Sequence, residues 1–283
     1  MIRIVSDSTC DLTQELVERY GITILPLHVL LGDKEYKDGV DVTPDEIYKW
    51  ADEHKTTPKT SAPSVEDAIG AFRPILDAGD EIVAFSISSG MSASYEYMQM
   101  AAKELKAADR ISVVDSSNLS TGIGHLVIEA AVRASEGKSR EEIVSYVESL
   151  RGRVRASFVV DTLTYLYRGG RCSGLSALAG GALRIHPKIE VREGAMHPTK
   201  KYRGKYSVVV LDYARDMEPE LIKAKTDRVF ITHSGIDPAI VESVREYLTG
   251  LRHFDEIHET RAGGVISSHC GYGTLGVLFI AGK

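Results

Sequence analysis

Hydroxyl-bearing side chains gather in two short stretches of the sequence, and each stretch leads into a pattern typical of a helix. In KTSAPSVEDA, Thr60 and Ser61 are adjacent, and SISSGMSAS contains Ser89 and Ser92. Neutral hydroxyl groups can donate hydrogen bonds to an anion, and a helix N-terminus adds unpaired N–H groups and the positive end of its dipole. Both stretches therefore have the chemistry of an anion site.

Helix capping is the ordinary alternative for both stretches. In the first, Ser64 is followed by acidic residues and is the better N-cap, which leaves Thr60 and Ser61 without a capping role. In the second, Ser89 or Ser92 could cap the helix that follows. Neither GxxxxGK[ST] nor a GxGxxG after the first apolar segment is present, so we do not expect nucleotide binding.

Two further residues have side chains suited to a ligand. His269 lies in the glycine-rich stretch SSHCGYGTLG, and Arg171 follows two glycines in YRGGRCS. An imidazole can hydrogen-bond a ligand, and a guanidinium can hold a carboxylate or phosphate, but a loop histidine and a solvated arginine are equally ordinary. No GxSxG is present, and no cluster of His, Asp and Glu has metal-ligand spacing. The sequence thus predicts neither a hydrolase triad nor a metal centre.

The first half of the chain repeats one pattern, an apolar strand, a polar turn and a helix. A strand is predicted at residues 2–6, and the stretches 81–90 and 110–117 each begin as a strand and run into a polar turn. Two more helices are predicted at 43–54 and 64–79. This alternation is typical of a parallel α/β sheet, in which ligands bind beyond the carboxyl ends of the strands. The serine turn SISSG lies at such an end.

The second half mixes strands and helices differently. RASFVVD at 155–161 is a predicted strand, and KIEVREGAMHPTKKY is a predicted hairpin. Further strands are predicted in KYSVVVLDYA, DRVFITHSG, HFDEIHET and GTLGVLFIAG. We therefore expect an α/β protein of two domains, an N-terminal parallel-sheet domain over 1–153 and a C-terminal α+β domain over 154–283.

Composition restricts the partners. The 283 residues are 43% hydrophobic and 26% charged, as in soluble globular proteins, and the formal charge of −6 argues against nucleic acid as a ligand. No apolar run approaches the ~18 residues of a membrane span. Cys10, Cys172 and Cys270 lie far apart and form no CxxC, which suits reduced thiols. We expect a soluble, cytoplasmic protein.

Six motifs, taken in order, resemble those of the DegV family: DST (7–9), TSAPS, SSGMSASY, VVDSSNLSTGIG, YRGGRCS and HCGYGTLG. The resemblance covers the whole chain. It implies a two-domain α/β fold, similar to part of dihydroxyacetone kinase, that encloses one long-chain fatty acid between or beneath the domains. Well-understood members of the family are acyl carriers. They present the fatty acid to a separate ATP-dependent kinase, which makes an acyl phosphate for phospholipid synthesis.

The resemblance also assigns residues. It implies that hydroxyls and a histidine bind the carboxylate, namely Thr60, Ser61, Ser89, Ser92 and His269. It implies that Arg171 of the GGR motif contributes to docking of the kinase subunit. Ala93 and Ser94 replace the usual Gly-Thr of the serine turn, Cys172 replaces an aliphatic residue, and Tyr272 replaces a proline. These departures alter the rim of the site and leave its hydroxyls and histidine in place.

A fatty acid suits these residues chemically. Burial of each CH₂ gains ~0.8 kcal/mol, so a chain of about 16 carbons gains on the order of 10 kcal/mol before ordering costs. An unpaired buried carboxylate costs several kcal/mol, which hydroxyl donors offset. We expect a lipid carrier that performs no chemistry and needs no cofactor. Its partners would be a long-chain fatty acid and a fatty-acid kinase subunit, with transient contact at a membrane surface also allowed.

Two other functions remain open from the sequence. A kinase-like subunit could hold a small carbonyl substrate through His269, and a small-molecule-responsive regulator would bind no lipid. A long apolar cavity would favour lipid, and a small polar one would favour a sugar. Seven apolar residues could line such a tunnel or belong to the core, which is the simpler assignment for each: Met91, Met98, Leu163, Leu166, Leu175, Leu178 and Leu183.

Overall fold

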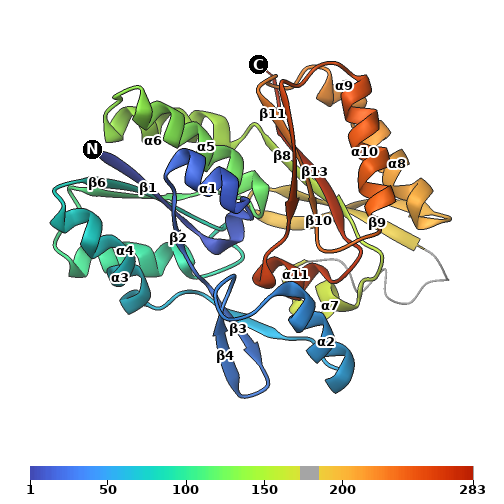
Figure 1. The fold of residues 1–283 in the computed structure, drawn as a ribbon, viewed down its shortest axis with the longest axis horizontal. Coiled ribbons are helices and arrows are strands. Elements are labelled where there is room, and N and C mark those ends of the chain that lie inside the picture. Colours follow the sequence, from blue (N-terminus) through green and yellow to red (C-terminus); the bar gives the residue numbers. More distant parts are fainter. Residues whose placement is uncertain (173–184, 283) are drawn as a thin grey trace.

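Four parallel strands form the first sheet, as the repeated strand–turn–helix pattern predicts (Figure 1). The computed structural model describes residues 1–172 and 185–282. Within these residues the strand order is β2-β1-β6-β7, and every pairing is parallel. The strands are β1 (Ile2–Asp7), β2 (Thr23–Leu25), β6 (Glu81–Ser86) and β7 (Ile111–Asp115). Their apolar runs reflect a sheet that is covered on both faces.

Helices cover the two faces of this sheet (Figure 1). One face packs against α3 (Val65–Asp77) and α4 (Ser94–Glu104), and the other packs against α5 (Thr121–Ser135) and α6 (Arg140–Arg151). The short helix α1 (Gln14–Tyr20) packs against α5. Helix α5 is buried from Thr121 to Ala131, because one side packs on the first sheet and the other packs against the second sheet.

The second sheet is mixed, which confirms the predicted change of architecture. Among the described residues it has six strands in the order β10-β9-β8-β13-β11-β12, and only the β11–β12 pairing is parallel. The predicted hairpin forms β9 and β10. The strands are β8 (Val154–Val159), β9 (Ile185–Arg192), β10 (Ala195–Arg203), β11 (Arg228–His233), β12 (Glu256–Arg261) and β13 (Leu275–Ile280). Its helices are α8 (Tyr206–Asp216), α9 (Glu218–Leu221) and α10 (Pro238–Gly250).

Helix α8 corrects one prediction, because KYSVVVLDYA was expected to be a strand. Its three consecutive valines favour a strand locally. The buried side chains instead recur at helical spacing and pack into the core cluster on the outer face of the second sheet. They are Val209, Val210, Tyr213 and Ala214. Tertiary packing of this face therefore outweighs the local β preference.

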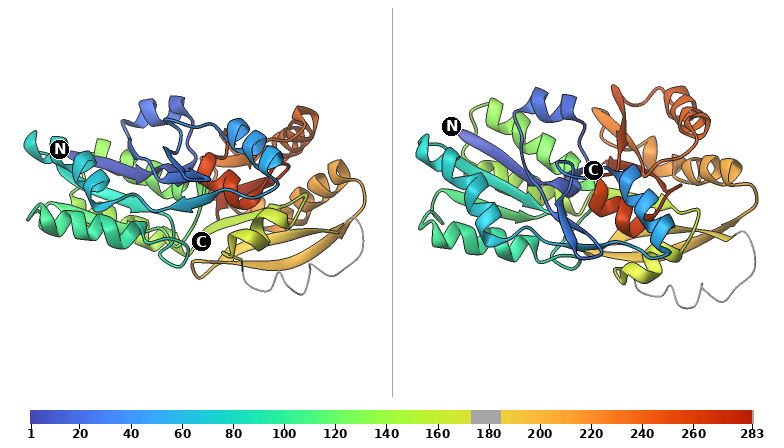
Figure 2. Two further views of the ribbon diagram at one scale, coloured as in Figure 1. Left: turned by 90° about the horizontal axis from the view of Figure 1, so that it is seen from below. Right: turned by 60° about the horizontal axis from the view of Figure 1, so that its bottom comes forward.

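A small antiparallel sheet and three helices lie at the junction of the two larger sheets (Figures 1 and 2). The sheet has the order β4-β3-β5, with β3 (His28–Leu31), β4 (Lys34–Lys37) and β5 (Lys59–Ser61). The helices are α2 (Pro44–His54), α7 (Thr164–Gly169) and α11 (Gly264–Cys270). Helix α11 contacts α2, α7, β3 and β5, so it is the element around which this junction is built.

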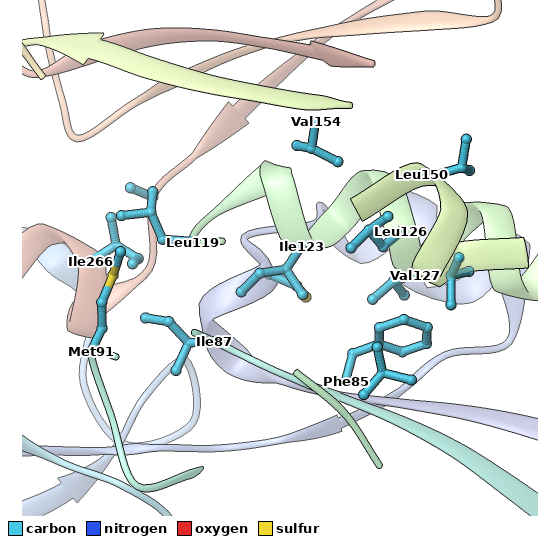
Figure 3. Close-up of a cluster of buried hydrophobic side chains, with 14 of the residues drawn as sticks. Phe85, Ile87, Met91, Leu119, Ile123, Leu126, Val127, Leu150, Val154 and Ile266 are labelled. Atoms are coloured by element: carbon cyan, nitrogen blue, oxygen red, sulfur yellow. The ribbon is translucent and has the colours of Figure 1, made fainter. Parts of the chain in front are cut away.

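The largest hydrophobic cluster runs from the first sheet to the second (Figure 3). It joins Phe85 and Ile123 of the N-terminal half to Phe158 and Ile266 of the C-terminal half. The proposed boundary at 153/154 precedes the first strand of the second sheet and remains a prediction. No helix in the described ranges is long and apolar enough to cross a membrane.

Candidate functional site

A pocket of about 260 Å³ lies at the junction of the two halves. Strand β5, the turn after β6 and helix α11 form its walls. Its polar lining comprises Thr60, Ser61, Ser92, Arg171 and His269. Its apolar lining includes Leu27, Ile87, Met91, Leu119, Met196, Val265 and Ile266. Residues that are distant in the sequence thus form one cavity with hydroxyl, imidazole and guanidinium groups beside an apolar wall.

Thr60 and His269 form the central polar contact of this pocket. Thr60 Oγ1 lies 2.8 Å from His269 Nε2. The other ring nitrogen, Nδ1, is buried and has no hydrogen-bond partner among the described residues. A buried unsatisfied N–H is costlier than an unsatisfied lone pair, so the proton favours Nε2, which then donates to Thr60. The hydroxyl hydrogen of Thr60 is thereby left for a group in the pocket.

Gly169 explains how the imidazole fits. A Cβ atom on Gly169 would overlap His269 Nδ1, so only glycine lets α7 approach the ring this closely. Burial, together with the charge of Arg171, lowers the pKa of His269 to about 4. The imidazole is therefore neutral near pH 7. His269 was expected in a glycine-rich loop, but it lies in the last turn of α11, which ends only at Cys270.

Ser61 and Ser92 lie at the mouth of the pocket. Ser61 is the exposed last residue of β5, and Ser64 caps the following helix through a capping box with Asp67, as predicted. Ser92 Oγ lies 2.9 Å from the hydroxyl of buried Ser94. When Ser94 donates in that pair, the Ser92 hydroxyl hydrogen is available to a ligand. The N-cap position of α4 is Ala93, and Ser92 Oγ accepts from the amide of Ser94, the first residue of that helix, at 3.3 Å.

Ser89 does not belong to this group. Its hydroxyl donates to Asp115 Oδ2 at 2.6 Å, and its amide donates to Asp115 Oδ1 at 3.2 Å. Ser89 is exposed and is absent from the described lining of the pocket. The two serines of the turn therefore differ in their contacts. Ser89 bonds the turn to the end of β7, and Ser92 faces the pocket.

Arg171 lies at the rim. It is exposed, lines the pocket, and donates from Nη1 to the carbonyl oxygen of Gly169 at 2.8 Å. That bond holds the guanidinium beside the glycine that touches His269. Arg171 is thus positioned to meet both a bound anion and a molecule that approaches from solvent.

The apolar wall continues into the main core (Figure 3). Met91 and Ile266 face Ile87 and Leu119, and Ile123 and Phe85 follow deeper in the cluster. Of the seven apolar candidates, Met91 lines the pocket, Leu166 belongs to the core and Leu163 packs against it, while Met98 is buried in the separate cluster beneath α4. Leu175, Leu178 and Leu183 lie outside the described residues.

Leu119 and Tyr97 are pocket residues that the sequence analysis did not identify. Leu119 follows β7, and the rule that ligands bind at strand ends could have singled out its turn, as it did the serine turn. Tyr97 lies one helical turn after Ala93, on α4, and had no sequence signal that separates it from other surface aromatics.

A family model agrees with this architecture. The model described as "Uncharacterised protein, DegV family" matches residues 1–282. The chain belongs to the DegV family. It is 33% identical over 280 residues to a DegV domain-containing protein of Caldanaerobacter subterraneus, covering 98% of each chain.

Solved DegV structures share the fold over almost their whole length. A DegV family protein from Thermus thermophilus, described for its fatty acid binding, is 32% identical with a TM-score of 0.91 and 99% of each chain covered. A stearic acid-binding protein from Eubacterium ventriosum is 31% identical with a TM-score of 0.86, covering 99% of this chain and 98% of that one. DegV of Bacillus subtilis, described as a fatty acid binding protein, is 26% identical with a TM-score of 0.85, and 99% of each chain is covered.

The low pKa of His269 gives a pH prediction for the ligand-free protein. The folded state holds the pKa of His269 near 4, below the ordinary 6.5. Below pH 6.5 the unfolded chain therefore binds a proton that the folded protein does not. The part of the unfolding free energy that depends on this ring is fully present above pH 6.5 and is lost as the pH falls toward 4. NMR titration of the ring should show a midpoint well below 6.5. In His269→Asn, the pH dependence of the unfolding free energy that comes from this ring should be absent. An ordinary midpoint in the wild type would contradict the enclosed, neutral imidazole.

Proposed function

We propose that the protein binds one long-chain fatty acid, with the carboxylate at the polar end of the pocket and the acyl chain along its apolar wall. The carboxylate would accept hydrogen bonds from Thr60, Ser61 and Ser92, with His269 completing the cluster through Thr60. The observation that carries this proposal is the pocket itself, where neutral donors from three distant segments meet beside an apolar wall. The fatty acids bound by related DegV proteins support it.

Neutral donors suit reversible binding of an anion. Hydrogen bonds to a charged group contribute about 1.5–3 kcal/mol each, enough to offset desolvation of the carboxylate without a buried cation. Ser61 and Arg171 are exposed, so the carboxylate end lies near the surface. A partner could reach the carboxylate there while the acyl chain stays buried.

The acyl chain requires more room than the pocket of about 260 Å³ provides, since pockets that enclose drug-sized ligands span about 300–1,000 Å³. An apolar cavity of about 20 Å³ adjoins the pocket and shares Leu119, Ile266 and Cys270 with it. Rotation of these side chains would join the two spaces. We propose that the chain extends past this partition, into the core between the two halves.

We further propose that the protein is a carrier and that a separate fatty-acid kinase subunit performs phosphoryl transfer. The exposed guanidinium of Arg171, fixed beside the polar cluster, would contact that kinase. Supply of acyl phosphate for phospholipid synthesis would place the carrier in the cytoplasm, with transient contact at the membrane surface.

The alternative of a carbonyl substrate held by His269 has less support. Covalent use of the ring would need a free nitrogen, but Nε2 is hydrogen-bonded to Thr60 and Nδ1 is covered by Gly169. A small sugar would also leave the apolar wall of Ile87, Met91 and Ile266 unfilled.

Native mass spectrometry of the purified protein, with organic extraction of the same sample, tests the proposal. We expect one long-chain fatty acid per chain, released on denaturation. A delipidated sample should regain it from albumin-free fatty acid and should not bind dihydroxyacetone. Absence of fatty acid from both the purified and the reloaded protein would refute the proposal.

Ser92 and Ser89 form a matched pair for mutation. Ser92→Ala should weaken fatty-acid affinity by about tenfold or more, since one hydrogen bond to the carboxylate is lost. Ser89→Ala removes the same atom a few residues away and should leave affinity within about twofold, because that hydroxyl donates to Asp115. Fluorescent fatty-acid displacement measures both. Equal losses would show that the turn, and not the Ser92 hydroxyl, matters.

Arg171 and Arg168 provide a second matched pair. Both are exposed, but only Arg171 lines the pocket. Arg171→Ala should keep the bound lipid and lower acyl-phosphate formation by at least about tenfold in a reconstituted assay with the kinase, as expected for loss of a desolvated interface arginine. Arg168→Ala should retain activity. Full activity of Arg171→Ala would remove the docking role.

A further inference from the structure

Three aspartates are buried near the pocket but do not line it. Asp7, Asp11 and Asp38 are 0%, 5% and 3% exposed. No cation lies within ion-pair distance of them in the part of the chain that the structure describes. Burial raises the pKa of Asp7 to about 6 and of Asp11 to about 8, and it raises that of Asp38 as well. Burial of a carboxyl group without a cation costs free energy, so other contacts must stabilise these three groups.

Two of these carboxyl groups accept the amide hydrogens at the start of α11. Asp38 Oδ1 accepts from the amide of Gly264 at 2.6 Å, and Asp11 Oδ1 accepts from that of Gly263 at 2.8 Å. The first amides of a helix have no partner within it, and Gly263 has no side chain to cap them. The aspartates come from segments 226 and 252 residues away and supply these acceptors.

The fit at this end of α11 is close. A Cβ on Gly264 would lie 2.8 Å from Asp38 Oδ1 and 2.7 Å from Ile47 Cδ1. Glycine therefore lets the helix backbone rest directly on the carboxyl group and on α2. In either protonation state a carboxyl group keeps an oxygen that can accept the amide hydrogen.

We propose that Asp38 and Asp11 are positioning residues of the binding site, acting on His269 through helix α11. The helix begins on the two carboxyl groups and has His269 in its last turn, with Val265 and Ile266 lining the pocket between. Because α11 is short, the two hydrogen bonds that fix its first turn also fix the position of its last turn, where the Thr60–His269 bond forms.

The DST motif extends the same arrangement to other walls of the pocket. Asp7 Oδ2 accepts from the amide of Ile87 at 2.8 Å. Ser8 Oγ accepts from the amide of Leu27 at 3.1 Å and donates to Asp38 Oδ2 at 2.8 Å. Ile87 and Leu27 both line the pocket. The motif lines no part of the pocket itself. Its polar atoms hold the backbone of two segments that do, and Ser8 reaches the third, α11, through Asp38.

The experiment compares Asp38→Ala with Asp38→Asn. Asparagine keeps an oxygen for Gly264, so it should retain function, while alanine leaves that amide unsatisfied. We expect Asp38→Ala to shift the NMR titration of His269 upward, toward an ordinary histidine, and to weaken fatty-acid affinity by about tenfold or more. Asp38→Asn should keep most of the wild-type His269 titration and most of the wild-type fatty-acid affinity. Ser8→Ala, a milder change, should shift both readouts in the same direction and serves if Asp38→Ala does not fold.

Glu129 provides the control for a purely structural effect. It is another buried acid, on α5, and accepts from Lys225 Nζ and Arg228 Nη1 at 2.8 Å each. Glu129→Ala should lower thermal stability and leave the titration of folded His269 unchanged. An Asp38→Ala protein that is destabilised but keeps the wild-type His269 titration and affinity would overturn the inference.

The expected loss of fatty-acid affinity rests on the proposed function, whereas the His269 titration is measured without any ligand. If the wild-type protein binds no fatty acid, the proposed function fails alone. The Asp38 variants would still show whether the aspartates position His269.

Discussion

The Thr60→Val variant is expected to bind long-chain fatty acid about 10- to 100-fold more weakly than the wild type. Valine has nearly the shape of threonine and suits a strand, so β5 should keep its pairing with β3. The change removes the hydroxyl that links His269 to the carboxylate and leaves Nε2 without its partner. Loss of a hydrogen bond to a charged group costs about 1.5–3 kcal/mol. Calorimetric titration with a delipidated sample measures the effect.

Thr60→Ser is the matched control for this prediction, since it keeps the hydroxyl and should bind within about threefold of the wild type. Thermal unfolding of both variants separates loss of binding from loss of fold. Affinity that survives in Thr60→Val would mean that the carboxylate is bound elsewhere, and the proposed polar cluster would be wrong.

The Gly169→Ala variant should have an effect of similar size from outside the pocket lining. The added methyl group would overlap His269 Nδ1, and we expect the ring to turn away from Thr60 to relieve the overlap. We expect about tenfold weaker fatty-acid binding, because the hydrogen bond to Thr60 is lost. The NMR signal of the His269 ring should shift, which reports the displacement without any ligand.

Gly152→Ala controls for the general effect of replacing a glycine. A Cβ at position 152 meets nothing within 4 Å, and its backbone conformation with φ of −70° suits any residue. This variant should match the wild type in affinity and in the His269 signal. If Gly169→Ala behaved like Gly152→Ala, α7 would be able to yield, and the ring would not depend on this contact.

The sequence predicted local features of the site better than long-range ones. Assignment of Ser64 as a helix cap depends only on its neighbours in the chain, and it freed Thr60 and Ser61 for another role. The repeated strand–turn–helix pattern also located the serine turn at the end of a parallel strand. Such features follow from short-range hydrogen bonding and from the periodicity of apolar side chains.

The remaining features depend on contacts between distant segments. Thr60 and His269 are 209 residues apart, and no spacing rule relates them. Ser89 and Ser92 are equivalent in the sequence, yet Asp115 engages only the first of them. Helix α8 forms because one of its faces packs in the core, against the β preference of its valines. The role of Asp38 could not be foreseen either, since it depends on where α11 begins.

A crystal structure of the protein purified without added lipid tests the central claim most directly. We expect electron density for one fatty acid. Its carboxylate should lie within hydrogen-bond distance of Thr60 Oγ1 and Ser92 Oγ, and its chain should pass Met91, Leu119 and Ile266. A small polar molecule bound at His269, or a lipid whose carboxylate lies away from Thr60 and Ser92, would contradict it.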